Sequence, residues 1–132
     1  MIPSRPADLR EALEQVVHGI PGLEVHLEVE DSVEVGETEA AALVRAVQEI
    51  VTNTLRHAGA RSLRVAVERD PEGGTVLRAQ DDGHGIAQVR PGHGLSGLIE
   101  RFEALGGEVR LDGQGGQGTQ GGFAVTARVP AV

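Results

Sequence analysis

Residues 48–58 read Gln-Glu-Ile-Val-Thr-Asn-Thr-Leu-Arg-His-Ala and close the amphipathic segment that decides the fold. Across residues 37–56, apolar side chains recur at intervals of three and four residues, which predicts a long helix lying on an apolar layer. Gly59 follows and predicts the end of the helix. The apolar stripe consists of Ala40, Leu43, Val44, Val47, Ile50, Val51 and Leu55.

A polar row occupies another face of this predicted helix. Glu49, Asn53 and His57 are spaced i, i+4 and i+8, and Arg56 lies at the edge of the row. A solvated helix end, with Arg and His near the negative end of the helix dipole, would give the same row. A carboxylate, a carboxamide and a guanidinium are also what a magnesium–phosphate site needs, because oxygen ligands hold the cation and guanidinium holds phosphate. The spacing leaves both interpretations open.

The segments on either side predict a sheet and two further helices. Helical spacing covers residues 6–19 and 95–105, and alternating patterns predict strands that pair as hairpins in the second half of the chain. The order is helix, strand, long helix, two strands, glycine loop, helix, two strands, which predicts a single α+β domain over residues 1–132. Its architecture is a two-layer sandwich with helices on one face of the sheet. The predicted strands cover residues 23–30, 62–68, 75–79, 108–111 and 123–129.

Composition excludes several classes of function. The chain has 132 residues and a net charge of −8, which disfavours nonspecific binding to nucleic acid or anionic lipid. All 12 basic residues are arginine and there is no cysteine, so lysine-based and thiol chemistry are excluded. The chain has no apolar run of roughly 20 residues and no signal-peptide pattern, so we expect a cytoplasmic protein without direct membrane contact.

Glycine is concentrated in the second half of the chain, where 13 of the 19 glycines lie between Gly83 and Gly122. The sequence Asp81-Asp82-Gly83-His84-Gly85-Ile86 follows a predicted strand. It would place a fixed carboxylate acceptor beside backbone that a flat ligand can approach. A tight turn is the simpler alternative. Residues 113–122 are either a loop with a function or a low-complexity linker.

The sequence Gly92-His93-Gly94-Leu95-Ser96-Gly97 leads into the helix predicted at residues 95–105. It matches G-x-G-x-x-G, but no buried strand precedes it and no repeated βαβ units surround it, so a dinucleotide-binding fold is disfavoured. Glycines leading into a helix N-terminus still expose N–H groups that bind phosphate. A P-loop is excluded because the chain has no lysine.

Taken together, residues 48–58, 81–86 and 92–101 resemble the N, G1 and G2 boxes of a histidine-kinase ATPase domain. The run Gly-Leu-Ser-Gly-Leu-Ile-Glu-Arg at 94–101, followed by Leu-Gly-Gly at 105–107, is similar to the NarL/DesK-type sensor kinases. The resemblance covers about residues 8 to 130. It implies the Bergerat fold, in which helices back a mixed, mainly antiparallel sheet and ATP lies between a helix and a lid.

The resemblance also implies roles for the residues of the long helix. Asn53 would coordinate Mg²⁺, and Glu49, one turn earlier, would contact a magnesium-bound water or act as a base. Arg56 and His57 would lie near the phosphates and the sugar of ATP. Glu49 and Asn53 are therefore the expected catalytic residues.

The glycine-rich motifs would hold the remainder of the nucleotide. Asp81 would accept a hydrogen bond from the adenine amino group, and Asp82 is only its neighbour. Residues 87–97 would form a short ATP lid. Whether Thr119 or the pair Gly122-Phe123 closes the adenine pocket is left open by the sequence. The other expected ATP-binding residues are Gly83, Gly85, Ile86, Gly92, Gly94 and Leu95.

The expected function is binding of Mg-ATP for transfer of the γ-phosphoryl group to a histidine. Nothing in the sequence matches the family's phosphoacceptor helical hairpin, so we expect a monomeric catalytic fragment that is incomplete for autophosphorylation. The acceptor domain and a NarL-type response regulator would be its partners. The alternatives are a stand-alone anti-sigma-type serine kinase of the same fold and a degenerate domain without nucleotide binding.

Overall fold

The computed structural model describes residues 6–58, 60–83, 93–113 and 123–130, and its elements follow the order that the sequence predicts. None of the helices in these ranges is long and apolar enough to span a bilayer. The elements are α1 (Pro6–Val17), β1 (Glu24–Val29), α2 (Glu37–Asn53), a π-helical turn η1 (Thr54–Ala58), β2 (Ser62–Arg69), β3 (Thr75–Asp81), α3 (His93–Ala104), β4 (Glu108–Gly113) and β5 (Phe123–Val129).

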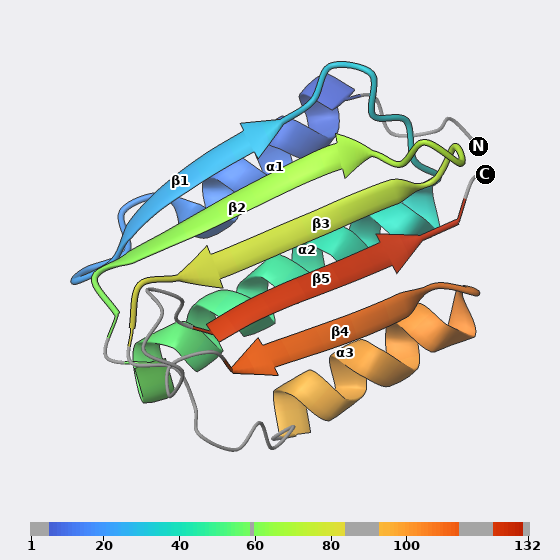
Figure 1. The fold of residues 1–132 in the computed structure, drawn as a ribbon. Helices are drawn as coiled ribbons and strands as arrows, with labels where there is room; N and C mark the ends of the chain where they lie inside the picture. Colours follow the sequence, from blue (N-terminus) through green and yellow to red (C-terminus); the bar gives the residue numbers. More distant parts are fainter. Residues whose placement is uncertain (1–5, 59, 84–92, 114–122, 131–132) are drawn as a thin grey trace.

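The described strands form one mixed sheet in the order β1-β2-β3-β5-β4 (Figure 1). Strands β2 and β3 pair as an antiparallel hairpin because only a short turn joins them. β1 pairs with β2 in parallel, which requires a crossover, and α2 supplies it. β5 lies between β3 and β4 and is antiparallel to both, so its first residue, Phe123, lies near the end of β3.

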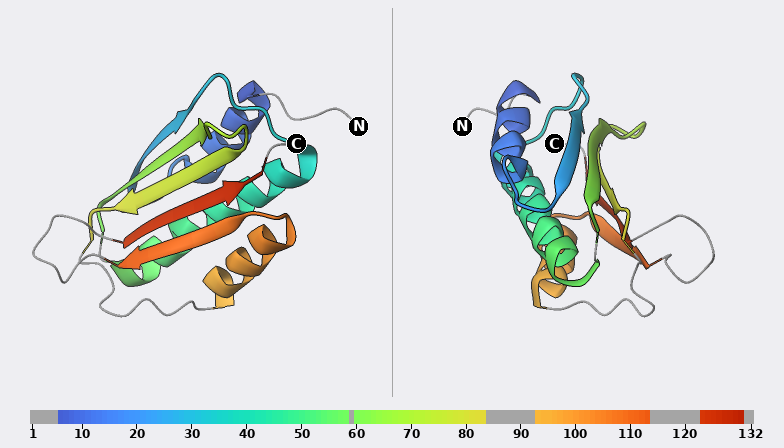
Figure 2. Two further views of the ribbon diagram at one scale, coloured as in Figure 1. Left: turned by 45° about the vertical axis from the view of Figure 1, so that its right-hand side comes forward. Right: turned by 90° about the vertical axis from the view of Figure 1, so that its left-hand side faces the viewer.

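The helices pack together on one face of this sheet (Figure 2). Alternate side chains of each central strand point into the layer between sheet and helices, as the period-two patterns predict. These observations confirm the predicted α+β two-layer sandwich. The largest side chains of this core are Phe102, Leu9, Leu13, Leu43, Ile50, Leu63, Leu77 and Leu98.

The predicted long helix is wrong at its C-terminal end. The α-helix stops at Asn53 and continues as the π-helical turn η1, whose i→i+5 pattern widens the coil and changes the angle between successive side chains. The buried stripe continues to Thr54 and ends there. Leu55, which we expected on the buried stripe, is 50% exposed, whereas Thr54 is 1% exposed.

Candidate functional site

Several buried polar side-chain atoms in the described ranges have no hydrogen-bond partner. Buried polar groups in proteins are nearly always paired, so a group of unpaired ones calls for an explanation such as a bound ligand or water. They come from the last turns of α2, the start of η1, the end of β3 and the last turn of α3. Within the described residues these atoms are Glu49 Oε2, Asn53 Nδ2, Thr54 Oγ1, Asp81 Oδ2 and Arg101 Nη1.

Asp81 is the last residue of β3, so the strand is two residues longer than the sequence indicated. Its side chain is only 3% exposed. Asp81 Oδ1 accepts hydrogen bonds from the backbone N–H groups of Gly83 at 2.9 Å and Phe123 at 3.1 Å. The second oxygen, Oδ2, is buried and has no partner. The carboxylate is thus held in place by its backbone bonds and keeps one acceptor free.

Asp82 has a different arrangement. Its Oδ1 accepts hydrogen bonds from the backbone N–H groups of Arg61 at 2.8 Å and Ser62 at 2.9 Å. These bonds, the one from Ser62 foremost, lower the pKa of Asp82 below its usual value. Asp82 therefore ties the end of β3 to the start of β2, and its role is structural.

Glu49 lies one turn before Asn53 on α2, and its side chain is 15% exposed. Its Oε1 is within 3.4 Å of Arg45 Nε on the same helix and within 3.5 Å of Arg101 Nη2 on α3. Its Oε2 is buried and unpaired, as is Nδ2 of Asn53. The last turns of α2 thus present a carboxylate oxygen and an amide nitrogen that no other described residue uses.

Two residues with unpaired buried atoms, Arg101 and Thr54, had no role in the sequence interpretation. Arg101 is the last residue of the third motif. Its place directly before Phe102 and three residues after Leu98, at the buried side of the helix, is the signal that could have found it. Thr54 follows Ile50 by four residues and so continues the buried stripe. Because threonine carries a hydroxyl group, the pattern of apolar residues did not include it.

The remaining expected site residues are placed only in part. Gly83 lies beside Asp81, and Arg56 is exposed on η1. His57 lies on η1, and Gly94 and Leu95 lie in the first turn of α3, where helix N–H groups lack intrahelical partners. Gly85, Ile86, Gly92 and Thr119 lie outside the described residues, as does Gly122.

Metal ligation by side chains alone has no candidate in the described ranges, where no group of three or more His, Asp or Glu residues could hold an ion. A cation bound at Asn53 would therefore take most of its ligands from water or from a bound anion. The oxygen chemistry of a carboxamide beside a carboxylate suits magnesium, which keeps several waters when it binds to proteins.

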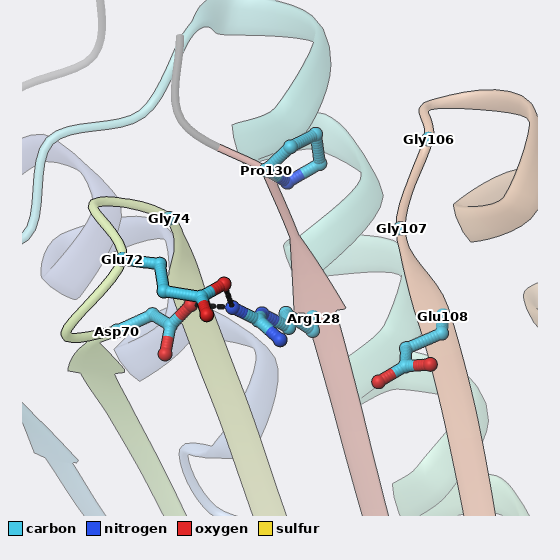
Figure 3. Close-up of a pocket in the computed structure, with 8 residues that line it drawn as sticks. All are labelled: Asp70, Glu72, Gly74, Gly106, Gly107, Glu108, Arg128 and Pro130. Atoms are coloured by element: carbon cyan, nitrogen blue, oxygen red, sulfur yellow. Dashed lines mark hydrogen bonds and ion pairs between the residues drawn. The ribbon is translucent and has the colours of Figure 1, made fainter.

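A cavity of about 350 Å³ lies at the opposite end of the sheet (Figure 3). Arg128 on β5 forms ion pairs there with Asp70 and, at 2.6 Å, with Glu72. The hydrogen bonds to Glu72 and Asp70 raise the pKa of Arg128, so its charge is retained. This cluster joins the β2–β3 turn to β5, and it contains none of the residues with unpaired buried atoms.

Comparisons with known proteins identify the family. The model of the histidine kinase-, DNA gyrase B- and HSP90-like ATPase family matches residues 38–132. The chain is 33% identical over 98 residues to an uncharacterized sensor-like histidine kinase of Chloroflexus aurantiacus, covering 68% of this chain and 16% of that protein. It is 34% identical over 80 residues to the nitrate/nitrite sensor protein NarQ of Escherichia coli, covering 58% of this chain and 14% of NarQ.

The fold is shared with solved structures. The ATP-binding domain of PrrB from Mycobacterium tuberculosis superposes with a TM-score of 0.73 at 23% identity, covering 99% of this chain and 97% of that one. This chain spans about a seventh of the length of the curated relatives named above. The family match, the curated relatives and the shared fold agree: the chain belongs to the histidine kinase-, DNA gyrase B- and HSP90-like ATPase family.

Proposed function

We propose that this chain is the ATP-binding catalytic domain of a two-component sensor histidine kinase. The observation that carries the proposal is the Asp81 carboxylate, which is buried, fixed through Oδ1 and free at Oδ2. A free acceptor in a buried place is costly unless a donor arrives to pair with it. The exocyclic amino group of adenine is such a donor.

This pairing also accounts for base selection. Guanine carries a carbonyl oxygen where adenine carries its amino group, so guanine would place one acceptor against another. A site that is built to bond one polar group discriminates strongly against a ligand lacking it, because its own buried group is then left unpaired. The backbone bonds to Gly83 and Phe123 prevent the carboxylate from turning away. We therefore expect adenine nucleotides to bind and guanine nucleotides to fail.

The triphosphate and Mg²⁺ would lie toward α2. Asn53 would contribute an oxygen ligand to Mg²⁺, and Glu49 Oε2 would accept a hydrogen bond from a magnesium-bound water. The N-terminus of α3, where helices favour anions, and exposed Arg56 support an anionic ligand. Magnesium would neutralise phosphate charge, and phosphoryl transfer depends mainly on such positioning and neutralisation.

The acceptor histidine would belong to a separate helical dimerisation domain, and a NarL-type response regulator would receive the phosphoryl group from it. We expect the chain alone to be monomeric and to lack autophosphorylation on a proper acceptor. The named relatives favour this function over the alternative of an anti-sigma-type serine kinase with the same fold.

The test is calorimetric titration of the chain with a nonhydrolysable ATP analogue and with the matching GTP analogue, each with and without Mg²⁺. Saturable binding of the adenine nucleotide alone, tighter with Mg²⁺, is the expected result. Equal binding of both nucleotides would refute the role of Asp81. Binding of neither would refute the proposal.

A further inference from the structure

The contact between Glu49 and Arg101 joins two helices across 52 positions of sequence. The distance between Glu49 Oε1 and Arg101 Nη2 is 3.5 Å, and the two side chains are 15% and 33% exposed. Glu49 lies one turn before Asn53, and Arg101 lies in the last turn of α3, the helix whose first turn contains Gly94 and Leu95. The pair therefore joins the part of α2 that carries Asn53 to α3.

The pair is also incomplete on both sides. Glu49 Oε2 and Arg101 Nη1 are each buried and each lack a hydrogen-bond partner. A guanidinium group and a carboxylate can form two parallel bonds, but here only one oxygen and one nitrogen meet. The guanidinium thus holds the carboxylate through Oε1 and leaves Oε2 for another donor.

Arg45 provides a natural comparison, because it approaches the same oxygen. Its Nε lies 3.4 Å from Glu49 Oε1, but it stands one turn away on the same helix and its side chain is 61% exposed. Exposed pairs of this kind contribute little, since solvent and salt screen them and long side chains lose entropy. Arg45 carries the same charge as Arg101, but its side chain is more exposed and it does not connect α2 to α3.

We propose that Arg101 is a positioning residue of the nucleotide site, acting through Glu49 across the interface between α2 and α3. The inference rests on the proposed function, because it assigns the free Oε2 of Glu49 to the hydration shell of the bound Mg²⁺. Without Arg101 the half-buried carboxylate loses its partner on α3 and turns freely. Nucleotide affinity then falls in the presence of Mg²⁺ and changes little in its absence.

The experiment is a double-mutant cycle on the whole chain. Parent, Arg101→Met, Glu49→Gln and the double variant are titrated with a nonhydrolysable ATP analogue, with and without Mg²⁺. We expect Arg101→Met to weaken binding about tenfold with Mg²⁺. The double variant should bind no more weakly than Glu49→Gln alone, because each substitution already abolishes the contact between the Glu49 carboxylate and the Arg101 guanidinium.

Two further variants separate positioning from charge and from folding. Arg45→Met removes an arginine from the same carboxylate oxygen and should change affinity less than about twofold. Arg101→Lys keeps the positive charge, so it should bind the nucleotide more tightly than Arg101→Met does. A purely structural role of Arg101 would not require this partial recovery. Thermal melting of every variant without nucleotide reports whether it is folded.

The outcomes distinguish the two claims. If the parent binds and the losses from Arg101→Met and Glu49→Gln simply add, or if Arg45→Met weakens binding as much as Arg101→Met, the inference is overturned and nucleotide binding stands. A loss from Arg101→Met that is equal with and without Mg²⁺ overturns it as well. If the parent itself binds no nucleotide, the proposed function fails and the inference fails with it.

Discussion

Asp81 and Asp82 are neighbours in the chain, yet their carboxylates accept hydrogen bonds from different segments. Asp81 binds the backbone of Gly83 and Phe123, whereas Asp82 binds the backbone of Arg61 and Ser62. Both carboxylates are anchored by two N–H groups, but only Asp81 has a buried oxygen left over. The pair therefore offers matched substitutions, of which only the one at Asp81 should weaken nucleotide binding.

The first prediction concerns nucleotide affinity. Asp81→Asn keeps an oxygen for Gly83 and Phe123 but places an NH₂ group where Oδ2 stood, so a donor faces the adenine amino group. Affinity for an ATP analogue should fall by about 1 to 3 kcal/mol, roughly 5- to 150-fold, with the fold retained. Asp82→Asn is the control and should bind like the parent in calorimetry. Equal effects of the two substitutions would contradict the assignment.

The second prediction is the pH dependence of stability at Asp82. Because its pKa is lowered from 3.8 in the folded protein, its charge stabilises the fold fully above about pH 4. This contribution is lost as pH falls through the lowered pKa. Asp82→Asn keeps the hydrogen bonds but not the charge, so it should melt below the parent at pH 7. The small difference should shrink as the pH falls through the lowered pKa of Asp82, and a pH-independent difference would disprove the charge effect.

The third prediction concerns Asn53. Asn53→Ala removes the amide that would ligate Mg²⁺ but leaves the Asp81 carboxylate in place. The variant should lose the magnesium-dependent part of its affinity for the ATP analogue and keep the part measured in EDTA. A titration series over Mg²⁺ concentration checks this. A loss that is the same in EDTA would assign Asn53 to the fold instead of to the cation.

The fourth prediction concerns the buried hydroxyl of Thr54. Thr54→Val has nearly the same shape and removes a polar group that lacks a partner, so it should stabilise the nucleotide-free protein by about 1 kcal/mol. Urea unfolding measures this change. Thr52→Val is the control: its hydroxyl donates to the carbonyl of Gln48 at 3.0 Å on the exposed side, and its loss should bring no gain. Destabilisation by Thr54→Val would mean that its hydroxyl is paired.

The fifth prediction compares two glycines that should respond to alanine with opposite signs. A Cβ at Gly107 would lie 1.9 Å from the carbonyl oxygen of Arg128, which is backbone and cannot yield easily. Gly107→Ala should therefore destabilise by about 1 to 3 kcal/mol. A Cβ at Gly97 meets only Arg101 Nη2 at 3.5 Å, and alanine favours helix by up to about 1 kcal/mol. Thermal melting that ranks the two variants the other way would disprove this packing argument.

Much of the fold could be predicted from periodicity. The alternation in residues 62–68 and 75–79 predicted a hairpin, and β2 and β3 pair as one. The apolar stripe of residues 37–56 predicted a helix on the sheet, which α2 is. Such patterns are reliable because the buried face of a helix or strand requires apolar residues at the repeat of that element. Periodicity does not report hydrogen-bond ring size, so the change to a π-turn at Thr54 and the exposure of Leu55 could not be foreseen.

The candidate site could be predicted only as a set of motifs. Spacing along α2 placed Glu49 and Asn53 together, but no spacing rule joins Glu49 to Arg101, because that contact depends on how α3 packs on α2. The unpaired oxygen of Asp81 could not be predicted from the sequence either. It depends on Phe123 from β5 occupying the other oxygen, which requires β5 to enter the sheet beside β3. Both contacts join segments that are distant in the sequence, so they exist only once the helices and strands have packed together.

The π-turn after Asn53 has a consequence for how this sequence can change. Its i→i+5 bonding spans one more residue than the i→i+4 bonding of an α-helix. The positions of residues after the turn therefore do not depend on how the residues of α2 pack. Up to Asn53, the buried face of α2 is held by the core. Beyond Thr54, a one-residue insertion or deletion would re-aim Arg56 and His57 and leave the buried core untouched. Evolution can therefore adjust this edge of the site by changing length as well as by substitution.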